Sequence, residues 1–110
     1  DEGFTFDDVL IRPAASAMEP AEASLQTNIG GINLTVPFLS AAMDRVTEVP
    51  MAVALGKLGG LGVLHRNCSI EEQVRMVKEV KAAGIHVAAA CGPFAADRAQ
   101  ALDDARTGTI

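Results

Sequence analysis

The sequence predicts an α/β fold in which parallel strands alternate with helices. Three runs of small aliphatic residues, over 36–42, 61–64 and 85–91, are typical of strands that are buried on both faces. Apolar residues at helical spacing follow each run. The strands end near residues 41, 65 and 91. A repeat of about 25 residues leaves short connections and therefore indicates right-handed parallel crossovers.

Two architectures have this repeat, the open doubly wound sheet and the (β/α)8 barrel. An open nucleotide-binding sheet usually carries a glycine-rich fingerprint after its first strand, and none follows the run over 36–42. The glycines at 59–62 precede a strand, so they do not form a phosphate loop. We therefore expect a (β/α)8 TIM barrel. Because a barrel runs to roughly 250 residues, this chain supplies an N-terminal hairpin and about three βα units.

Residues 1–35 are predicted to form an extended segment and a hairpin. The apolar run over 4–11 is stopped by Pro13. Alternating apolar residues over 25–29 and 32–36 flank Gly30-Gly31. A pair of glycines between alternating runs is typical of a two-residue hairpin turn, since both central positions need positive φ.

The first helix is predicted to follow the strand over 36–42. Thr47 is a candidate N-cap, and Pro50 fits the first helical turn, where a missing N–H costs nothing. Gly59-Gly60 end the helix. The strand over 61–64 comes next.

The second helix opens with Ser69 and Glu72, which have the spacing of a capping box. We expect an ion pair between Glu71 and Arg75 to support it, and Gly84 to end it. Its apolar face is predicted to comprise Ile70, Val74, Val77 and either Val80 or Lys81. A third helix is predicted over 95–105, and residues 109–110 resemble the start of a fourth strand.

Composition excludes several classes of protein. Hydrophobic residues make up 49% of the 110 residues and charged residues 21%, which is typical of a globular chain. The net charge of −5 argues against binding of nucleic acid and against a basic membrane patch. We also expect no signal peptide and no membrane span. Two cysteines are too few for a disulfide framework and favour a reducing cytoplasm.

Functional groups are expected beyond the carboxyl ends of the strands. Three clusters lie there: Ser40 to Asp44, His65 to Cys68, and Cys91 to Pro93. In the first, Met43 offers a soft surface for a flat ring and Asp44 a hydrogen-bond acceptor, or both simply belong to a packed strand end.

In the second cluster, Arg66 is suited to a carboxylate or phosphate. The alternative is that His65 closes the strand and Asn67 orders the turn. Cys68 and Cys91 are better interpreted as small buried thiols than as nucleophiles. Neither histidine nor cysteine spacing fits a zinc site, so no metal is expected on this chain.

Taken together, several segments resemble the IMP dehydrogenase family, in order and spacing. The matching segments are Phe4-Thr5-Phe6-Asp7-Asp8-Val9-Leu10-Ile11-Arg12-Pro13, Ser40-Ala41-Ala42-Met43-Asp44-Arg45-Val46-Thr47-Glu48, Gly59-Gly60-Leu61-Gly62-Val63-Leu64-His65-Arg66-Asn67, Ser69-Ile70-Glu71-Glu72-Gln73 and Val77-Lys78-Glu79-Val80-Lys81. The resemblance implies a barrel enzyme that oxidises inosine monophosphate (IMP) to xanthosine monophosphate (XMP) with NAD. It further implies a potassium site outside this chain, a cytoplasmic homotetramer and a cysteine that attacks the purine C2.

Carried over residue by residue, the resemblance places Ala41 and Met43 against the nucleotide substrate, Met43 against its purine. Ser40, Asp44, Arg66 and Asn67 become possible residues of the same rim. No catalytic residue is expected in this chain, because neither cysteine has the family's Gly-Ser-x-Cys setting. The 110 residues alone are therefore expected to be inactive, as the N-terminal portion of a single catalytic barrel domain.

The sequence departs from the family at two further points. The family's regulatory CBS insert is absent near 82–85 of this chain, and Arg45 stands where the family usually has threonine. The missing insert favours GMP reductase, a related barrel that deaminates GMP with NADPH. The strand ends at 40–43 and 65–67 favour the dehydrogenase instead, since the reductase usually reads Ala-Asn-Met-Asp and His-Lys-His there. A non-catalytic fragment or binding module is the third alternative.

Overall fold

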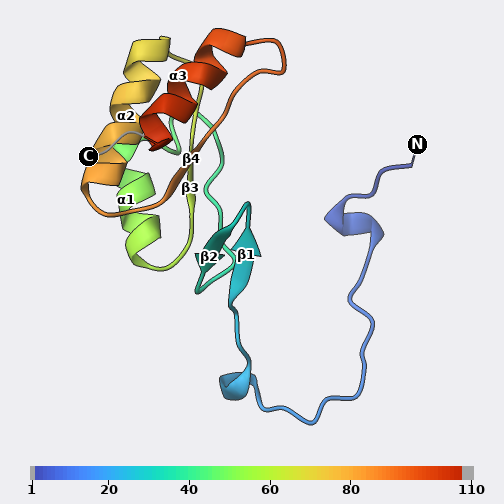
Figure 1. Ribbon diagram of the computed structural model, residues 1–110. Coiled ribbons are helices and arrows are strands. Elements are labelled where there is room, and N and C mark those ends of the chain that lie inside the picture. Colours follow the sequence, from blue (N-terminus) through green and yellow to red (C-terminus); the bar gives the residue numbers. More distant parts are fainter. Residues whose placement is uncertain (1, 108–110) are drawn as a thin grey trace.

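The computed structural model describes residues 2–107. Within them the chain forms three α-helices and two two-stranded sheets (Figure 1). The helices are α1 (Val49–Lys57), α2 (Ile70–Ala82) and α3 (Ala96–Thr107). The strands are β1 (Thr27–Ile29), β2 (Ile32–Leu34), β3 (Gly62–Leu64) and β4 (Val87–Ala89). The predicted fourth strand at 109–110 lies outside the described residues.

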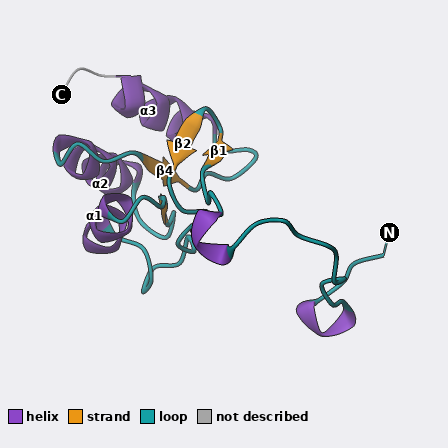
Figure 2. Ribbon diagram, turned by 90° about the horizontal axis from the view of Figure 1, so that it is seen from below, coloured by secondary structure: helices purple, strands orange, loops and turns teal. Residues whose placement is uncertain are grey.

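The N-terminal region is an extended arm that leads into the predicted hairpin. Residues 2–26 extend away from the helices and contain two 3-10 turns, Phe6–Asp8 and Pro20–Glu22 (Figures 1 and 2). β1 and β2 pair antiparallel across Gly30 and Gly31, whose φ angles are 54° and 82°. Positive φ at both turn positions confirms the hairpin and the reason for its two glycines.

The parallel arrangement of the strands is confirmed. β3 pairs parallel with β4, with Gly62 opposite Val87, and a parallel bridge joins Leu39 to Leu61. The predicted strand over 36–42 is nevertheless wrong in extent and burial. Only Leu39 makes a bridge, to Leu61, and Phe38 and Leu39 are 63% and 50% exposed. Among the described residues no second segment pairs with this one, so the run does not become a central strand. Residues 2–107 do not close into a barrel.

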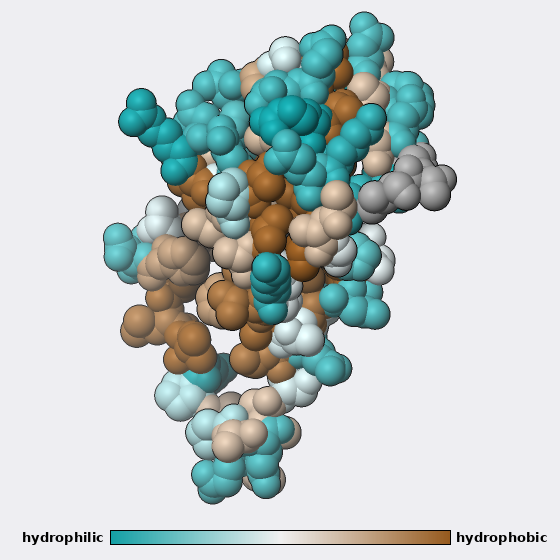
Figure 3. All heavy atoms as spheres, turned by 90° about the vertical axis from the view of Figure 1, so that its left-hand side faces the viewer, coloured by the Kyte–Doolittle hydropathy of each residue, from teal (hydrophilic) through white to brown (hydrophobic). Residues whose placement is uncertain are grey.

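The core lies between the helices and the β3–β4 sheet, with α2 in its centre. The buried apolar core residues are Ala52, Leu64, Met76, Val77, Val80 and Ala105. On α2 the predicted face holds for Val77 and Val80, but Gln73 and Met76 are buried where Ile70 and Val74 are only partly covered. Hydrophobic residues also reach the surface beside hydrophilic ones (Figure 3).

The helix caps agree only in part with the sequence prediction. Ser69 caps α2 by accepting the Glu72 N–H at 3.1 Å. The Glu72 carboxylate turns to Arg75 instead of completing the capping box, and Arg75 pairs with Glu72 and Glu79 rather than with Glu71. Arg75 therefore pairs with one carboxylate a turn before it and one a turn after it, and neither is the predicted Glu71.

The predicted N-cap of α1 is also wrong. The structure has Glu48 at that position, one residue after Thr47. The Thr47 side chain is fully buried and its hydroxyl lies 2.6 Å from the Ala41 carbonyl oxygen and 2.7 Å from Ser40 Oγ. Thr47 therefore stabilises the preceding loop instead of the helix.

Candidate functional site

The parallel strands bring three chain segments to one edge of the sheet. Ser40 donates its N–H to the Leu61 carbonyl at 3.1 Å, and Ala90 donates to the Leu64 carbonyl at 2.9 Å. We call this edge the rim, and it comprises the loop 40–47, the turn 65–68 and residues 90–93. Its position at the carboxyl ends of parallel strands is the usual place for ligands in α/β folds.

The loop 40–47 is tightly bonded within itself. The Met43 carbonyl accepts the N–H groups of Val46 and Thr47, at 2.9 and 3.0 Å. Ser40 Oγ also accepts the Val63 N–H at 3.4 Å, which ties the loop to β3. Ala41 and Met43 remain exposed, Met43 to 58%. The loop thus presents a small side chain and a thioether on a held backbone.

The turn 65–68 is organised around the buried His65. Its Nδ1 accepts the Asn67 N–H at 3.1 Å, so the neutral ring carries its proton on Nε2, which lies 3.0 Å from Glu48 Oε1. Asn67 in turn donates from Nδ2 to Asp44 Oδ2 at 2.9 Å. The turn is thereby joined to the loop 40–47 by a side-chain hydrogen bond.

Two residues that hydrogen-bond to the rim from outside it, and that sequence reasoning missed, are Gln73 of α2 and Arg98 of α3. Gln73 is fully buried, and its amide nitrogen donates to the His65 and Ala90 carbonyls at 3.0 and 2.9 Å. Arg98 donates to Gln73 Oε1 and to the Cys68 carbonyl, both at 2.7 Å. The detectable signal was an amide on the apolar stripe of α2, three residues before Met76.

The remaining predicted residues are distributed over all three segments of the rim. Arg66 is exposed and its Nη1 packs on Gly92, where an added Cβ would be 2.4 Å from that nitrogen. Cys68 is half-buried. The prediction that both thiols are buried is wrong for Cys91, which is exposed because the chain leaves the sheet at that point. Arg45 is exposed, and nothing in the structure explains its presence there.

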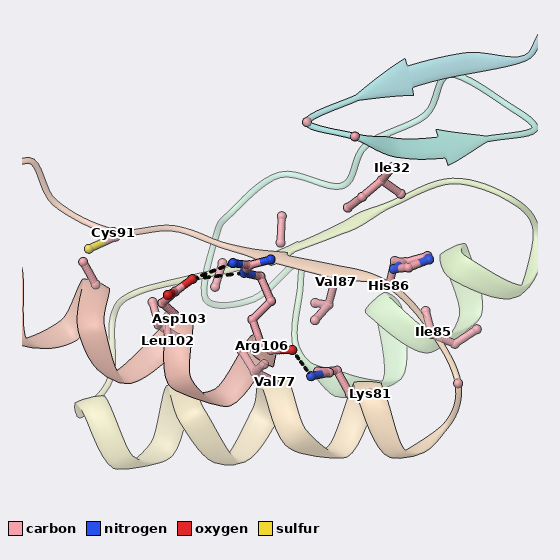
Figure 4. Close-up of a pocket in the computed structure, with 16 residues that line it drawn as sticks. Ile32, Val77, Lys81, Ile85, His86, Val87, Cys91, Leu102, Asp103 and Arg106 are labelled. Atoms are coloured by element: carbon pink, nitrogen blue, oxygen red, sulfur yellow. Dashed lines mark hydrogen bonds and ion pairs between the residues drawn. The ribbon is translucent and has the colours of Figure 1, made fainter. Parts of the chain in front are cut away.

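A cleft of about 810 Å³ lies apart from the loop 40–47, between the hairpin, β4 and α3. Ile32, Val87 and Leu102 give it a largely apolar wall, while Arg106 is held beside Asp103 (Figure 4). The cleft runs along β4, which pairs with β3 on its other side.

Among residues 2–107, no group of three or more His, Cys, Asp or Glu side chains is arranged to hold a metal ion. None of the helices in this part of the chain has the length and hydropathy needed to cross a bilayer.

The parallel strands, their covering helices and the polar rim define a segment of a parallel α/β domain of the kind that binds ligands beyond its strand ends. A family model described as the IMP dehydrogenase / GMP reductase domain matches residues 3–110. The chain belongs to this family.

Curated relatives support the same family. The chain is 56% identical over 82 residues to an inosine-5'-monophosphate dehydrogenase of Methanocaldococcus jannaschii, a match that covers 74% of this chain and 16% of the relative. It is 54% identical over 80 residues to the enzyme of the same name from Korarchaeum cryptofilum, covering 73% and 17%. The protein of that name from Borreliella burgdorferi is 49% identical over 81 residues, covering 73% and 20%. The chain thus spans a fifth or less of these relatives.

Proposed function

We propose that the complete protein containing this chain oxidises IMP to XMP with NAD as hydride acceptor. The observation that carries the proposal is the identity of 49–56% to relatives named inosine-5'-monophosphate dehydrogenase. The exposed Ala41 and Met43 on a firmly bonded loop suit a purine ring, because a small side chain admits the ring and a thioether packs on its face. We assign substrate contact to these two residues.

Four further residues are proposed to order the rim around the substrate. Asp44 and Asn67 do so through their mutual hydrogen bond, and Ser40 through its contacts with Thr47 and β3. Arg66 places a cation at the rim, and we assign it no contact with the substrate phosphate. The net charge of −5 does not attract a nucleotide, so the phosphate requires oriented backbone N–H groups elsewhere.

The chemistry itself is assigned to other parts of the complete protein. A cysteine in a later segment would add its thiolate to the purine C2, and the C2 hydride would leave to the nicotinamide that bound NAD supplies. Water would then hydrolyse the thioimidate, which breaks the C–S bond and releases XMP and the free thiol. We assign no residue of this chain to NAD or to the potassium ion that the family resemblance implies. This chain's residues would orient the purine and exclude water from one side of it.

The proposed architecture is the N-terminal portion of a single (β/α)8 barrel domain. Residues 1–35 supply the arm and hairpin, and residues 36–110 the βα units. Support comes from the parallel bridge between Leu39 and Leu61 and from the parallel pairing of β3 with β4, which set these segments side by side in chain order. The cleft beside β4 is the position that a next strand would take. We further propose a cytoplasmic homotetramer without binding of nucleic acid or membrane.

GMP reductase is the second candidate function. α2 ends at Ala82 and the chain turns at Gly84 straight towards β4, which leaves no room for the CBS insert at 82–85. This continuity is what a reductase would show, and also what a dehydrogenase without the insert would show. A catalytically inactive binding module is the remaining alternative.

Steady-state assays of the complete protein separate these functions. We expect NADH to form with IMP and NAD, and no NADPH consumption with GMP. The opposite pattern would establish the reductase. Binding of IMP without turnover of either nucleotide would favour the inactive module.

A further inference from the structure

We propose that Gln73 and Arg98 act together as positioning residues for the substrate-contact loop 40–47, which they hold through the turn 65–68. The proposal rests on the proposed function for the identity of the ligand, a purine nucleotide. A chain of hydrogen bonds leads from α2 and α3 to the rim.

The first step is the buried amide of Gln73. Its nitrogen lies 3.0 Å from the His65 carbonyl and 2.9 Å from the Ala90 carbonyl, so both N–H groups are used. Its oxygen accepts from Arg98 Nη1 at 2.7 Å. These partners fix the orientation of the amide, because the reverse orientation would set its oxygen against two carbonyls. Gln73 therefore joins the carboxyl ends of β3 and β4.

The second step is Arg98, which reaches the other end of the turn. Its Nη2 donates to the Cys68 carbonyl at 2.7 Å while Nη1 holds Gln73. The planar guanidinium thus fixes two acceptors at once. The turn 65–68 is held at its first residue by Gln73 and at its last by Arg98.

The third step leads from the turn to the loop. Asn67, inside the turn, donates to Asp44 at 2.9 Å, and Asp44 is the neighbour of Met43 in the chain. Among the hydrogen bonds of the described residues, none joins Gln73 or Arg98 directly to the loop 40–47. The side-chain route from Gln73 and Arg98 to Met43 therefore runs through the turn and the Asn67–Asp44 hydrogen bond, beside the backbone route through β3 and Ser40.

A purely stabilising role explains this arrangement poorly. Burying an amide beside a guanidinium carries a desolvation penalty, and apolar residues of similar volume are often at least as stabilising. A fully satisfied buried polar network instead specifies one arrangement of the segments that it joins. The backbone carbonyls that it fixes here are those that border the rim.

The test is a double-mutant cycle in the complete protein, with Gln73→Met, Arg98→Met and the double variant. We expect each single variant to raise the KM for IMP about tenfold, a factor that corresponds to about 1.4 kcal/mol. The effect on kcat should be smaller, and the KM for NAD unchanged. Because the two side chains act as one unit, the double variant should resemble either single variant. Arg106→Met, on the same helix and away from the rim, is the matched control.

A merely structural role would lower the active fraction and hence the apparent kcat, with the KM for IMP unchanged, and this result would overturn the proposal. Multiplying effects in the double variant would also contradict it. Arg98→Lys keeps the positive charge but replaces the two donor nitrogens of the fork with one, so its KM for IMP should be intermediate. If Gln73→Met does not fold, the KM of Arg98→Lys for IMP still tests the proposal.

Limited trypsin digestion provides a readout that needs no turnover. In the Gln73→Met and Arg98→Met variants, cleavage after Arg45 and Arg66 should accelerate relative to cleavage after Lys78 in α2, which reports global unfolding. Equal acceleration at all three sites would contradict the proposal. If the wild-type protein does not turn over IMP, only the proposed function is contradicted, because the digestion still tests whether Gln73 and Arg98 hold the loop 40–47.

Discussion

Two buried side chains, Thr47 within the rim and Gln73 beside it, hydrogen-bond to backbone carbonyls of the rim. Thr47 reaches the Ala41 carbonyl and Gln73 reaches the His65 and Ala90 carbonyls, each from a position that is fully buried. A buried polar atom without such a partner would cost about 1–3 kcal/mol. These residues therefore fix the backbone at the strand ends while leaving Ala41 and Met43 exposed.

Glu72 gives a residue-scale prediction of pH dependence. Its hydrogen bond with Arg75 lowers the pKa of the Glu72 carboxyl from its ordinary value of 4.5. A lowered pKa in the folded state stabilises the fold above the ordinary value, and this contribution disappears as the pH falls through the folded-state pKa. Urea unfolding should thus show that Glu72→Gln destabilises the protein near pH 7, and that the difference from the wild type shrinks as the pH falls below 4.5 through the lowered folded-state pKa.

The effect should be small, because both partners are exposed and screened by salt. Glu71→Gln is the matched control, since it removes a charge from the same helical turn without removing an ion pair to Arg75. Equal pH profiles for the two variants would show that the Arg75 pair has no role.

The contrast between Ser69 and Gln73 shows which site residues sequence can predict. Ser69 caps its own helix, and the capping group lies three residues away. Gln73 bonds to Ala90 and Arg98, 17 and 25 residues away, so no local pattern specifies its partners. For the same reason the pair of Asp44 and Asn67, 23 residues apart, emerged only in three dimensions.

At the scale of elements, sequence predicted the hairpin, the three helices and the parallel order of the strands. Gly30-Gly31 and the small aliphatic runs are local signals, so they survive in a short chain. The predicted strand over 36–42 does not form at its predicted length, because a central strand needs a neighbour on each side. Among the described residues this segment is bridged only at Leu39, to Leu61. The misplaced cap of α1 has a different cause, since the Thr47 hydroxyl found partners in the loop before it.

The packing of α1 on β3 gives a prediction at this scale. A Cβ on Gly62 would lie 2.6 Å from the Ala52 Cα and 2.7 Å from its Cβ, so the helix would have to move. We expect Gly62→Ala to destabilise the complete protein by about 1–3 kcal/mol, as overpacking usually does. Urea unfolding measures the loss. Gly3→Ala, where nothing lies within 4 Å, should leave the stability unchanged, and equal values for the two would refute the packing account.

At the scale of the whole molecule, the described chain leaves apolar surface uncovered. Among the described residues Leu39 pairs only with Leu61 and β4 only with β3. Phe6, Leu10 and Ile11 on the arm are at least 96% exposed. Unpaired strands and exposed apolar residues promote association.

We therefore predict that the isolated 110-residue chain self-associates and forms no NADH from IMP and NAD. Light scattering after size-exclusion chromatography and an absorbance assay check the two parts. A monodisperse monomer that unfolds cooperatively would contradict the first part, and IMP-dependent NADH formation the second.

At the same scale, the loop 40–47 and the turn 65–68 are proposed to form part of the IMP site of the complete protein. Hydrogen–deuterium exchange of the complete protein with and without saturating IMP tests it most directly. We predict slower amide exchange in peptides covering 40–47 and 65–68, with no change in residues 3–13 of the arm. Unchanged exchange in both rim peptides, with IMP binding shown independently, would contradict the account.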